Sequence, residues 1–260
     1  MHPVRGTTRR EQPLRTRTAA TLALAVALAV LTTALAALAV APASAPASHP
    51  DIPPPCPQDS QAEAPDYDGD CKADLAVFRP SEGVWWTRYA DGSHRGVQWG
   101  QAGDIPVPGD YDGDAKTDNG DAKTDFAVFR PSTGTWHVLH SSDGSHRSEQ
   151  WGQNGDIPLS GDYDGDAKTD FAVFRPSEGN WYVLRNSGGT LGGQWGKDGD
   201  IPLSGDYDGD AKTDFAVFRP SEGTWYVLPR SSDGSKLQQQ WGQEGDVPVA
   251  CRKKGDHCMR

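Results

Sequence analysis

The sequence predicts an all-β fold, a β-propeller built from four antiparallel, four-stranded blades. Three observations lead to it: a unit of about 44 residues recurs four times, glycine and proline are frequent, and no helix-period segment follows residue 47. The 260 residues include 30 Gly and 20 Pro, the two poorest residues in helix interiors. Four short strands per repeat are typical of propeller blades. A β-helix with shorter coils is the structural alternative.

Residues 1–47 differ from the rest and are typical of a secretory signal peptide. Arginines are frequent in residues 5–17, an uncharged apolar stretch covers 19–40, and small residues and prolines follow. The alternative is an uncleaved anchor, because the apolar stretch is long enough to span a membrane. We therefore expect a secreted, extracellular protein, or one anchored to the outer face of the cell membrane. Residues 48–64 are predicted to be a proline-rich linker.

The repeats are expected at about residues 65–104, 105–156, 157–200 and 201–246. Each contains the run Asp-Tyr-Asp-Gly-Asp, with its tyrosine at position 67, 111, 163 or 207. The second repeat is longer because residues 112–118 are duplicated, with one substitution, as 119–125.

Each repeat is expected to form four short strands, and the third repeat shows them most clearly. They are predicted at residues 157–161, 171–175 and 181–184, and around 193–195. An acidic loop over residues 162–170 joins the first two strands, and Gly-rich turns separate the others.

The two ends of the array depart from the repeat. The opening strand of the first repeat is degenerate, over residues 61–65, whereas residues 246–249 predict an opening strand that no further repeat follows. Residues 251–260 form a tail unrelated to the repeat. A four-bladed ring, closed by residues 247–249, and a fragment of a larger propeller are both compatible with this pattern. An incomplete propeller would leave oligomerisation open.

Each repeat carries an acidic loop with aspartates at positions 1, 3, 5 and 9, and with a lysine at position 7 that can offer its backbone carbonyl. The expected ligands in the first, third and fourth loops are Asp66, Asp68, Asp70, Lys72 and Asp74, then Asp162, Asp164, Asp166, Lys168 and Asp170, then Asp206, Asp208, Asp210, Lys212 and Asp214. The second loop offers Asp110, Asp112, Asp114, Lys116 and Asp118 or, from the duplicate copy, Asn119, Asp121 and Asp125.

The loops predict metal sites, because several carboxylates in one tight loop repel each other unless a cation lies between them. Ca²⁺ accepts 6–8 oxygen ligands with tolerant geometry, whereas Mg²⁺ demands a strict octahedron. We expect one Ca²⁺ per loop and up to four in all; the seven extra residues of the second loop must either bulge out or replace its original ligands. The alternative is a set of solvated Asp/Gly turns.

These motifs resemble the FG-GAP/VCBS-type repeat. The resemblance rests on Gln-Trp-Gly, Gly-Asp-Ile-Pro, Asp-x-Asp-Gly-Asp-x-Lys-x-Asp and Ala-Val-Phe-Arg-Pro-Ser, over about residues 65–250. It implies a β-propeller with Ca²⁺ in the loop between the first two strands of each blade, as in integrin alpha-subunits. Two features depart from the family: it usually has seven blades, and it usually has glycine at loop position 6, where this chain has Cys71, Ala115, Ala167 and Ala211.

The cysteines and tryptophans are expected to be structural. Cys56, Cys71, Cys251 and Cys258 suggest two disulfides in an exported chain, in any of three pairings, with zinc binding as a minor alternative. Two tryptophan sets recur, one in Gln-Trp-Gly and one in the third strand. They are predicted to pack between blades, and sugar binding is the alternative. The sets are Trp99, Trp151, Trp195 and Trp241, and Trp86, Trp136, Trp181 and Trp225.

One arginine ends the second strand of each repeat and is expected to pair with loop carboxylates. The four are Arg79, Arg130, Arg175 and Arg219.

The sequence favours a non-catalytic extracellular module that binds protein or carbohydrate. A net charge of −11 argues against nucleic-acid binding, and no known catalytic motif is present. A membrane contact is expected only if the leader is retained. The alternatives are a secreted hydrolase or an accessory part of one, and a membrane-anchored structural protein of the cell surface.

Overall fold

The structure is a computed structural model that describes residues 65–114, 123–230 and 235–249. The predicted leader, the linker, the tail and most of the duplicated segment lie outside these ranges. Within them, no helix has the length and apolar character needed to cross a membrane.

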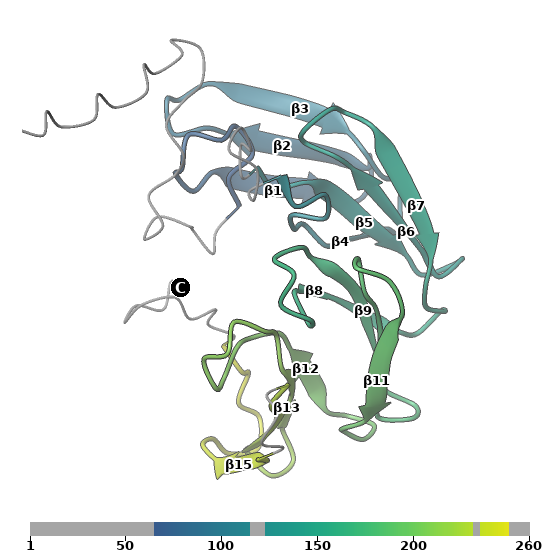
Figure 1. The fold of residues 1–260 in the computed structure, drawn as a ribbon, viewed down its shortest axis with the longest axis vertical. Coiled ribbons are helices and arrows are strands. Elements are labelled where there is room, and N and C mark those ends of the chain that lie inside the picture. Colours follow the sequence, from purple (N-terminus) through teal and green to yellow (C-terminus); the bar gives the residue numbers. More distant parts are fainter. Residues whose placement is uncertain (1–64, 115–122, 231–234, 250–260) are drawn as a thin grey trace, which may run out of the picture. The chain divides into compact units, whose positions relative to one another are not determined.

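The described residues form β-strands joined by turns and loops (Figure 1). In chain order the strands are β1 (Leu75–Arg79), β2 (Val84–Arg88), β3 (His94–Gln98), β4 (Ile105–Pro106), β5 (Phe126–Arg130), β6 (Thr135–Leu139), β7 (His146–Gln150), β8 (Ile157–Gly161), β9 (Asp170–Arg175), β10 (Asn180–Leu184), β11 (Thr190–Gln194), β12 (Ile201–Leu203), β13 (Phe215–Arg219), β14 (Thr224–Leu228) and β15 (Leu237–Gln240).

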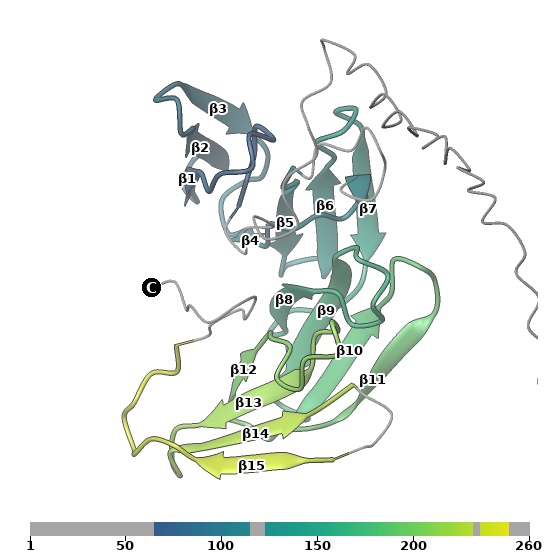
Figure 2. The same cartoon turned by 60° about the vertical axis from the view of Figure 1, so that its left-hand side comes forward.

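The strands form four antiparallel sheets, and each sheet follows the chain order (Figure 2). Three of them have four strands: β4-β5-β6-β7, β8-β9-β10-β11 and β12-β13-β14-β15. The first sheet has three strands among the described residues, β1-β2-β3, and the degenerate opening strand predicted at 61–65 lies almost entirely outside them. The prediction of an all-β fold of antiparallel blades is thus confirmed, and we call these sheets blades 1 to 4.

In blades 2, 3 and 4 the second strand is apolar on both faces, and this explains its burial. In β9 the side chains of Phe171 and Val173 join a core cluster with Trp136 of blade 2. Ala172 and Phe174 point the other way, into the next cluster. Because side chains alternate along a strand, one Phe-Ala-Val-Phe run supplies two cores, one on each side of the blade.

A glycine turn after each second strand requires its backbone conformation. Gly179 has φ +65°, and its N–H donates to the carbonyl of Arg175 at 2.9 Å. A Cβ on this residue would lie 2.2 Å from the carbonyl oxygen of Gly196. Only glycine fits, which explains the Pro-Ser-x-Gly turn of every repeat.

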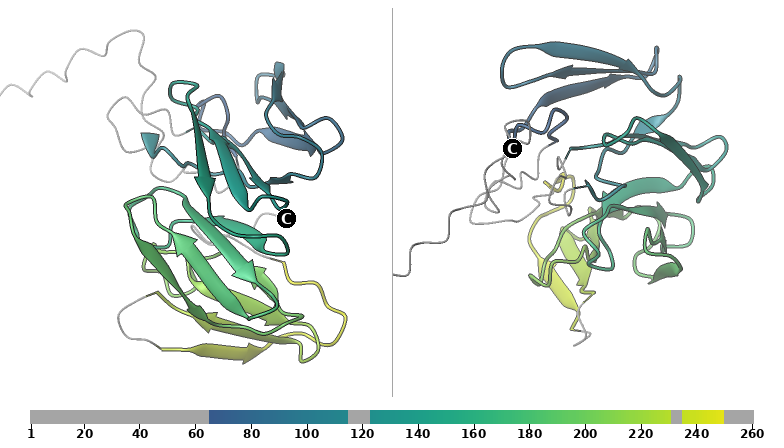
Figure 3. Two further views of the ribbon diagram at one scale, coloured as in Figure 1. Left: turned by 90° about the vertical axis from the view of Figure 1, so that its right-hand side faces the viewer. Right: turned by 45° about the horizontal axis from the view of Figure 1, so that its top comes forward.

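Figure 3 shows the strands of the four blades from two further directions. Consecutive blades are joined by the indoles of the Gln-Trp-Gly motif, whose N–H groups donate to the next blade. The pairs are Trp99 with the carbonyl of His137 at 3.1 Å, Trp151 with Tyr182 at 3.2 Å, and Trp195 with Tyr226 at 3.1 Å.

In blade 1 the tryptophan that corresponds to Trp136 is Trp85 on β2, and the assignment of Trp86 to this position was wrong. Trp85 is buried and donates its indole N–H to the carbonyl of Trp99, as Trp136 does to that of Trp151. Trp86 points to the opposite face of β2 and is 39% exposed. The adjacent tryptophans hide the register, because either one fits the repeat by composition.

The arginines at the ends of the second strands pair with carboxylates, but not with those of the acidic loops. Arg175 holds Asp156 through two hydrogen bonds of 2.8 and 2.9 Å, and Asp156 belongs to the Gly-Asp-Ile-Pro motif. Arg130 binds Asp104 and Arg219 binds Asp200 in the same way. The expected pairing with loop aspartates was therefore wrong. Arg130, Arg175 and Arg219 instead fix the start of their own blade's opening strand. Arg79 pairs with exposed Glu82.

The proposed disulfides stay a prediction. Cys71 lies in the first acidic loop, and the other three cysteines lie outside the described residues.

Candidate metal centres

The aspartate at loop position 1 is held by the backbone of its own loop. In the third loop, Asp162 Oδ1 accepts the N–H of Gly165 at 2.7 Å, and Oδ2 accepts that of Ala167 at 2.6 Å. Asp66 and Asp206 make the same two contacts. The loop therefore winds around this carboxylate, which fixes where its neighbours at positions 3 and 5 point.

Position 6 of the loop takes a backbone conformation that glycine favours. The φ angles are 65° at Cys71, 59° at Ala167 and 67° at Ala211, all in the left-handed region. A non-glycine residue there costs roughly 1–2 kcal/mol. The cysteine and the alanines at this position therefore hold a strained backbone conformation.

The aspartate at position 9 ties the loop to the strands beside it. Asp170 Oδ2 accepts the N–H of Tyr163 at 2.9 Å, and Oδ1 accepts that of Asn186 at 2.7 Å. The same pair of bonds recurs in blades 2 and 4. In blade 1, Asp74 Oδ2 binds the N–H of Tyr67, whereas its buried Oδ1 has no hydrogen-bond partner.

Three carboxylates converge in each loop, with one oxygen from each lying within 4.8 Å of the others. The groups are Asp66, Asp68 and Asp70; Asp110, Asp112 and Asp114; Asp162, Asp164 and Asp170; and Asp206, Asp208 and Asp210.

Other predicted ligands lie outside these groups. Asp74, Asp166 and Asp214 are in their loops but not among the converging oxygens. The lysines at position 7 donate their backbone N–H to the aspartate at position 5, in the loops of Lys72, Lys168 and Lys212. Lys116, Asp118, Asn119 and Asp121 lie outside the described residues.

Lysine side chains also reach the acidic loops. The Lys72 ammonium lies 2.7 Å from Asp70 Oδ2, within its own loop. The Lys168 ammonium instead donates to the backbone carbonyl of Asp112, in the loop of the preceding blade. Both ammonium groups bring positive charge to the carboxylates, so a metal ion would replace part of a charge balance that already exists.

The structure decides which copy of the duplicated segment ends the second loop. Asp125 accepts the N–H of Tyr111 at 2.9 Å and pairs with Gly109 in an isolated β-bridge. These are the contacts that Asp170 makes in the third loop, where Gly161 is its strand partner. Asp125 therefore takes position 9, and the insertion precedes it.

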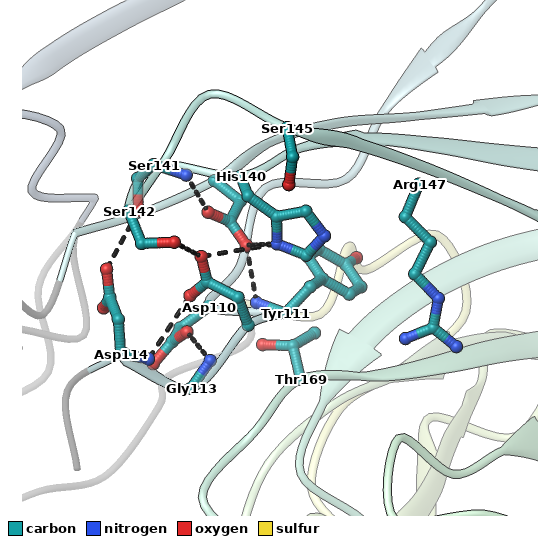
Figure 4. A network of polar contacts seen from close by, with 12 residues as sticks. Asp110, Tyr111, Gly113, Asp114, His140, Ser141, Ser142, Ser145, Arg147 and Thr169 are labelled. Atoms are coloured by element: carbon teal, nitrogen blue, oxygen red, sulfur yellow. Dashed lines mark hydrogen bonds and ion pairs between the residues drawn. The ribbon is translucent and has the colours of Figure 1, made fainter. Parts of the chain in front are cut away.

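A histidine in the turn after β6, His140, reaches the second loop, and it was not among the expected ligands (Figure 4). His140 Nδ1 lies 3.3 Å from Asp112 Oδ2 and 3.7 Å from Asp125 Oδ2, so these three side chains form a further group of candidate ligands. The Ser142 hydroxyl adds a hydrogen bond to Asp112 Oδ2 at 2.6 Å. The other repeats have Tyr89, Arg185 and Pro229 in place of His140, so the repeat pattern gave no signal for it.

Burial raises the pKa of several loop carboxyls, and neighbouring carboxylates add to the effect. The pKa of Asp110 rises to about 7, mainly because it is buried and also because Asp112 and Asp125 are near. Burial likewise raises the pKa of Asp170 and of Asp214 to about 6. The negative form is therefore unfavourable in these loops until a cation or a proton compensates it.

The donor set fits a hard cation. All converging atoms in the first, third and fourth loops are carboxylate oxygens, which suit Ca²⁺, Mg²⁺ or Mn²⁺ better than softer metals. Two ligand oxygens on one Ca²⁺ at about 2.4 Å are at most about 4.8 Å apart, and the grouped oxygens meet this limit.

No known protein family matches the sequence, and no curated protein matches it. Among solved structures, the chain is similar to selenomethionine-substituted virginiamycin B lyase from Staphylococcus aureus, with 11% identity and a TM-score of 0.43, covering 64% of this chain and 52% of that one. It is also similar to a streptogramin B lyase, with 12% identity and a TM-score of 0.43, covering 68% and 52%. The chain thus spans about half the length of these structures. Similarity at this level says nothing about the ligand or activity of this chain.

Proposed function

We propose that the chain is a secreted calcium-binding repeat protein of the FG-GAP/VCBS type, acting as a non-catalytic extracellular binding module. The observation that carries the proposal is the recurrence of one loop geometry in four blades. In each loop three carboxylates converge, and in the described loops the backbone fixes the aspartates at positions 1 and 9. The converging carboxylates come from positions 1, 3 and 5 in three loops and from positions 1, 3 and 9 in the third, and solvated turns would not need three carboxylates to converge in all four.

Calcium would act on the folded state. The converging carboxylates exist only when Asp162 and its counterparts are held by the loop backbone, so an unfolded chain offers a much poorer site. A ligand that binds only the folded state stabilises it by mass action. Calcium affinities of extracellular modules, about 10⁻⁴–10⁻³ M, would suit this role.

The binding partner is a protein rather than a carbohydrate in this proposal. Sugar binding would need exposed indoles, but Trp85, Trp136 and Trp181 are buried in the blade cores. The indoles of the Gln-Trp-Gly motif in blades 1 to 3 are hydrogen-bonded to the next blade. These tryptophans of blades 1 to 3 thus serve packing, although Trp86 and Trp241 are exposed, and this favours a partner recognised by loops and strand edges.

Titration calorimetry with CaCl₂ tests the proposal on the chelator-treated protein. We expect saturable calcium binding with more than one site per chain, and weaker binding of Mg²⁺. Asp164→Asn and Asp208→Asn should each remove one site, because each residue contributes one of three converging oxygens. Asp198→Asn, on an exposed turn outside the loops, is the matched control and should leave the stoichiometry unchanged. Absence of calcium binding by the parent chain would overturn the proposal.

A further inference from the structure

The first strand of blade 1 has an apolar face that the corresponding strands of the other blades bury. In β1, Leu75 is 72% exposed and Val77 is 61% exposed. The residues in the same places on β9, Phe171 and Val173, are fully buried against blade 2. Among the described residues β1 pairs only with β2, so its other edge is also unpaired.

Blade 4 lacks the matching contribution from a following blade. The core clusters of blades 1, 2 and 3 each include two residues from the second strand of the next blade, such as Phe215 and Val217 beside Trp181. The cluster of blade 4 is formed by blade 4 alone, and its Trp225 is only partly buried. The two missing residues correspond to Leu75 and Val77.

Three further features at the C-terminal side of blade 4 lack the contacts that their counterparts make in the other blades: Trp241, Asp246 and residues 247–249. Each has a matching partner on blade 1. Trp241 is 79% exposed, whereas the corresponding Trp99 donates its indole N–H to the carbonyl of His137 in the next blade. In blade 1 the residue that corresponds to His137 is Trp86. Asp246 stands where Asp156 binds Arg175 in blade 3. The matching arginine of blade 1 is Arg79, which forms an ion pair with exposed Glu82.

Residues 247–249, directly after Asp246, have the pattern of an opening strand. Val247 and Val249 are 80% and 72% exposed, and they match the opening strands that begin at Ile157 and Ile201 in the other blades. No described strand pairs with them.

We infer that blade 1 of one copy of this chain docks on blade 4 of a second copy, in the geometry that joins consecutive blades within the chain. Residues 247–249 of one copy would pair with β1 of the other in the register of β8 with β9. That register places Val247 opposite Phe78 and Val249 opposite Ala76, as Ile157 lies opposite Phe174 and Leu159 opposite Ala172. Leu75 and Val77 would then complete the core of blade 4.

The occupant is a second copy because both faces belong to one chain and both are exposed in it. A head-to-tail contact of this kind is heterologous, and it forms a closed assembly when two copies make it twice. Two copies supply eight blades, within the range of roughly four to eight with which propellers close. Closure of one chain on itself would use the same faces, so the experiment must distinguish contact within one chain from contact between two copies.

Sedimentation velocity and light scattering on the purified chain give the first test. We expect a dimer, and Val77→Lys should raise its dissociation constant by about 100-fold or more, because a lysine charge cannot be buried in the core of blade 4. The melting temperature of the Val77→Lys variant should equal or exceed that of the dissociated parent chain, because Val77 is exposed in the single chain. Trp241→Ser should weaken the dimer from the other face. Ser81→Lys adds the same charge in an exposed turn and should leave the dimer intact.

Cysteine trapping gives the second test. One preparation carries Ala76→Cys and another carries Val249→Cys, and the two are mixed under oxidising conditions. Facing residues of antiparallel strands have Cα atoms about 4.5–5.5 Å apart, within disulfide range. A disulfide between peptides of the two preparations, identified by mass spectrometry, supports the second copy. A third preparation carries both substitutions in one chain. A monomeric parent chain, or a disulfide that forms only within the doubly substituted chain, would overturn the inference of a second copy.

Discussion

The backbone N–H of Thr169 donates to the carbonyl of Asp110 across 2.6 Å, and this bond joins the third acidic loop to the second. The same contact recurs at 2.6 Å between Thr213 and Asp162. Each loop is therefore held by the loop of the next blade through its first ligand residue. A change in one candidate site is expected to reach its neighbour through this bond.

The side chain of Thr169 packs against Gly109 so closely that alanine cannot replace the glycine. A Cβ on Gly109 would lie 2.6 Å from Thr169 Oγ1 and 2.8 Å from its methyl carbon. We expect Gly109→Ala to lower the free energy of unfolding by about 1–3 kcal/mol, the usual cost of overpacking. Denaturant unfolding measures it.

Two further variants test the cause of that loss. Gly193→Ala on β11, where a Cβ meets nothing within 4 Å, should cost little. The double variant Gly109→Ala/Thr169→Ala should recover part of the loss, because it removes the clashing atoms. Equal losses for Gly109→Ala and Gly193→Ala would show that the contact between loops is not tight.

The left-handed conformation of Ala167 predicts that glycine is better at loop position 6. Its φ is 59°, and relief of roughly 1–2 kcal/mol of strain exceeds the 0.5–1 kcal/mol that glycine loses in the unfolded chain. Ala167→Gly should therefore raise the free energy of unfolding by about 0.5–1 kcal/mol. Ala172→Gly, in buried β9, should lower it. A clear loss of stability in Ala167→Gly would mean that the loop does not adopt this conformation.

The buried ion pair of Arg175 and Asp156 should contribute far more than an exposed one. Asp156 is completely buried, and its partner's side chain is 17% exposed. Asp156→Asn removes the two short charged contacts of the guanidinium and leaves it only the 3.5 Å contact with Glu178, so we expect a loss of roughly 3 kcal/mol in thermal or chemical unfolding. Glu82→Gln breaks the exposed pair with Arg79 and should cost less than about 1 kcal/mol. Similar losses in the two variants would contradict the role of Asp156.

The raised pKa values of the loop aspartates predict how the metal-free protein responds to pH. Burial raises the pKa of Asp110 to about 7 and that of Asp170 to about 6, above the value of 3.8 for an ordinary aspartate. Between about pH 4 and pH 7 the folded state therefore binds more protons than the unfolded state, and its stability falls as the pH rises.

The melting temperature of the chelator-treated protein should thus be lower at pH 7 than at pH 5, as followed by circular dichroism. Saturating calcium should reduce or reverse the difference, because the cation takes the place of the protons. A metal-free protein that is more stable at pH 7 than at pH 5 would contradict the burial of these carboxyls.

The strands could be predicted because their pattern repeats with the period of the backbone. The Phe-Ala-Val-Phe-Arg run at residues 171–175 is apolar at every position except the last, which indicates a strand buried on both faces, as β9 is. The opening and third strands followed from turn residues at fixed distances. Each of these assignments rests on four similar segments, so the repeats support it better than a single segment would.

Other features depend on geometry that the repeat does not encode. Asp118 and Asp125 end identical Gly-Asp-Ala-Lys-Thr-Asp runs, and only the bridge to Gly109 separates them. Trp85 and Trp86 are neighbours of the same type, so the register of β2 with β3 had to distinguish them. His140 was missed because it approaches Asp112 from a turn 28 positions along the chain, where the repeats differ.

Calorimetric unfolding with and without calcium tests the central claim most directly. At about 10 mM Ca²⁺ and affinities of about 10⁻⁴–10⁻³ M, each occupied loop should add about 1–3 kcal/mol to the free energy of unfolding. Several occupied loops should raise the melting temperature by on the order of 10 °C over the sample with chelator. A melting temperature that is the same in calcium and in chelator would contradict the account of the acidic loops as calcium sites.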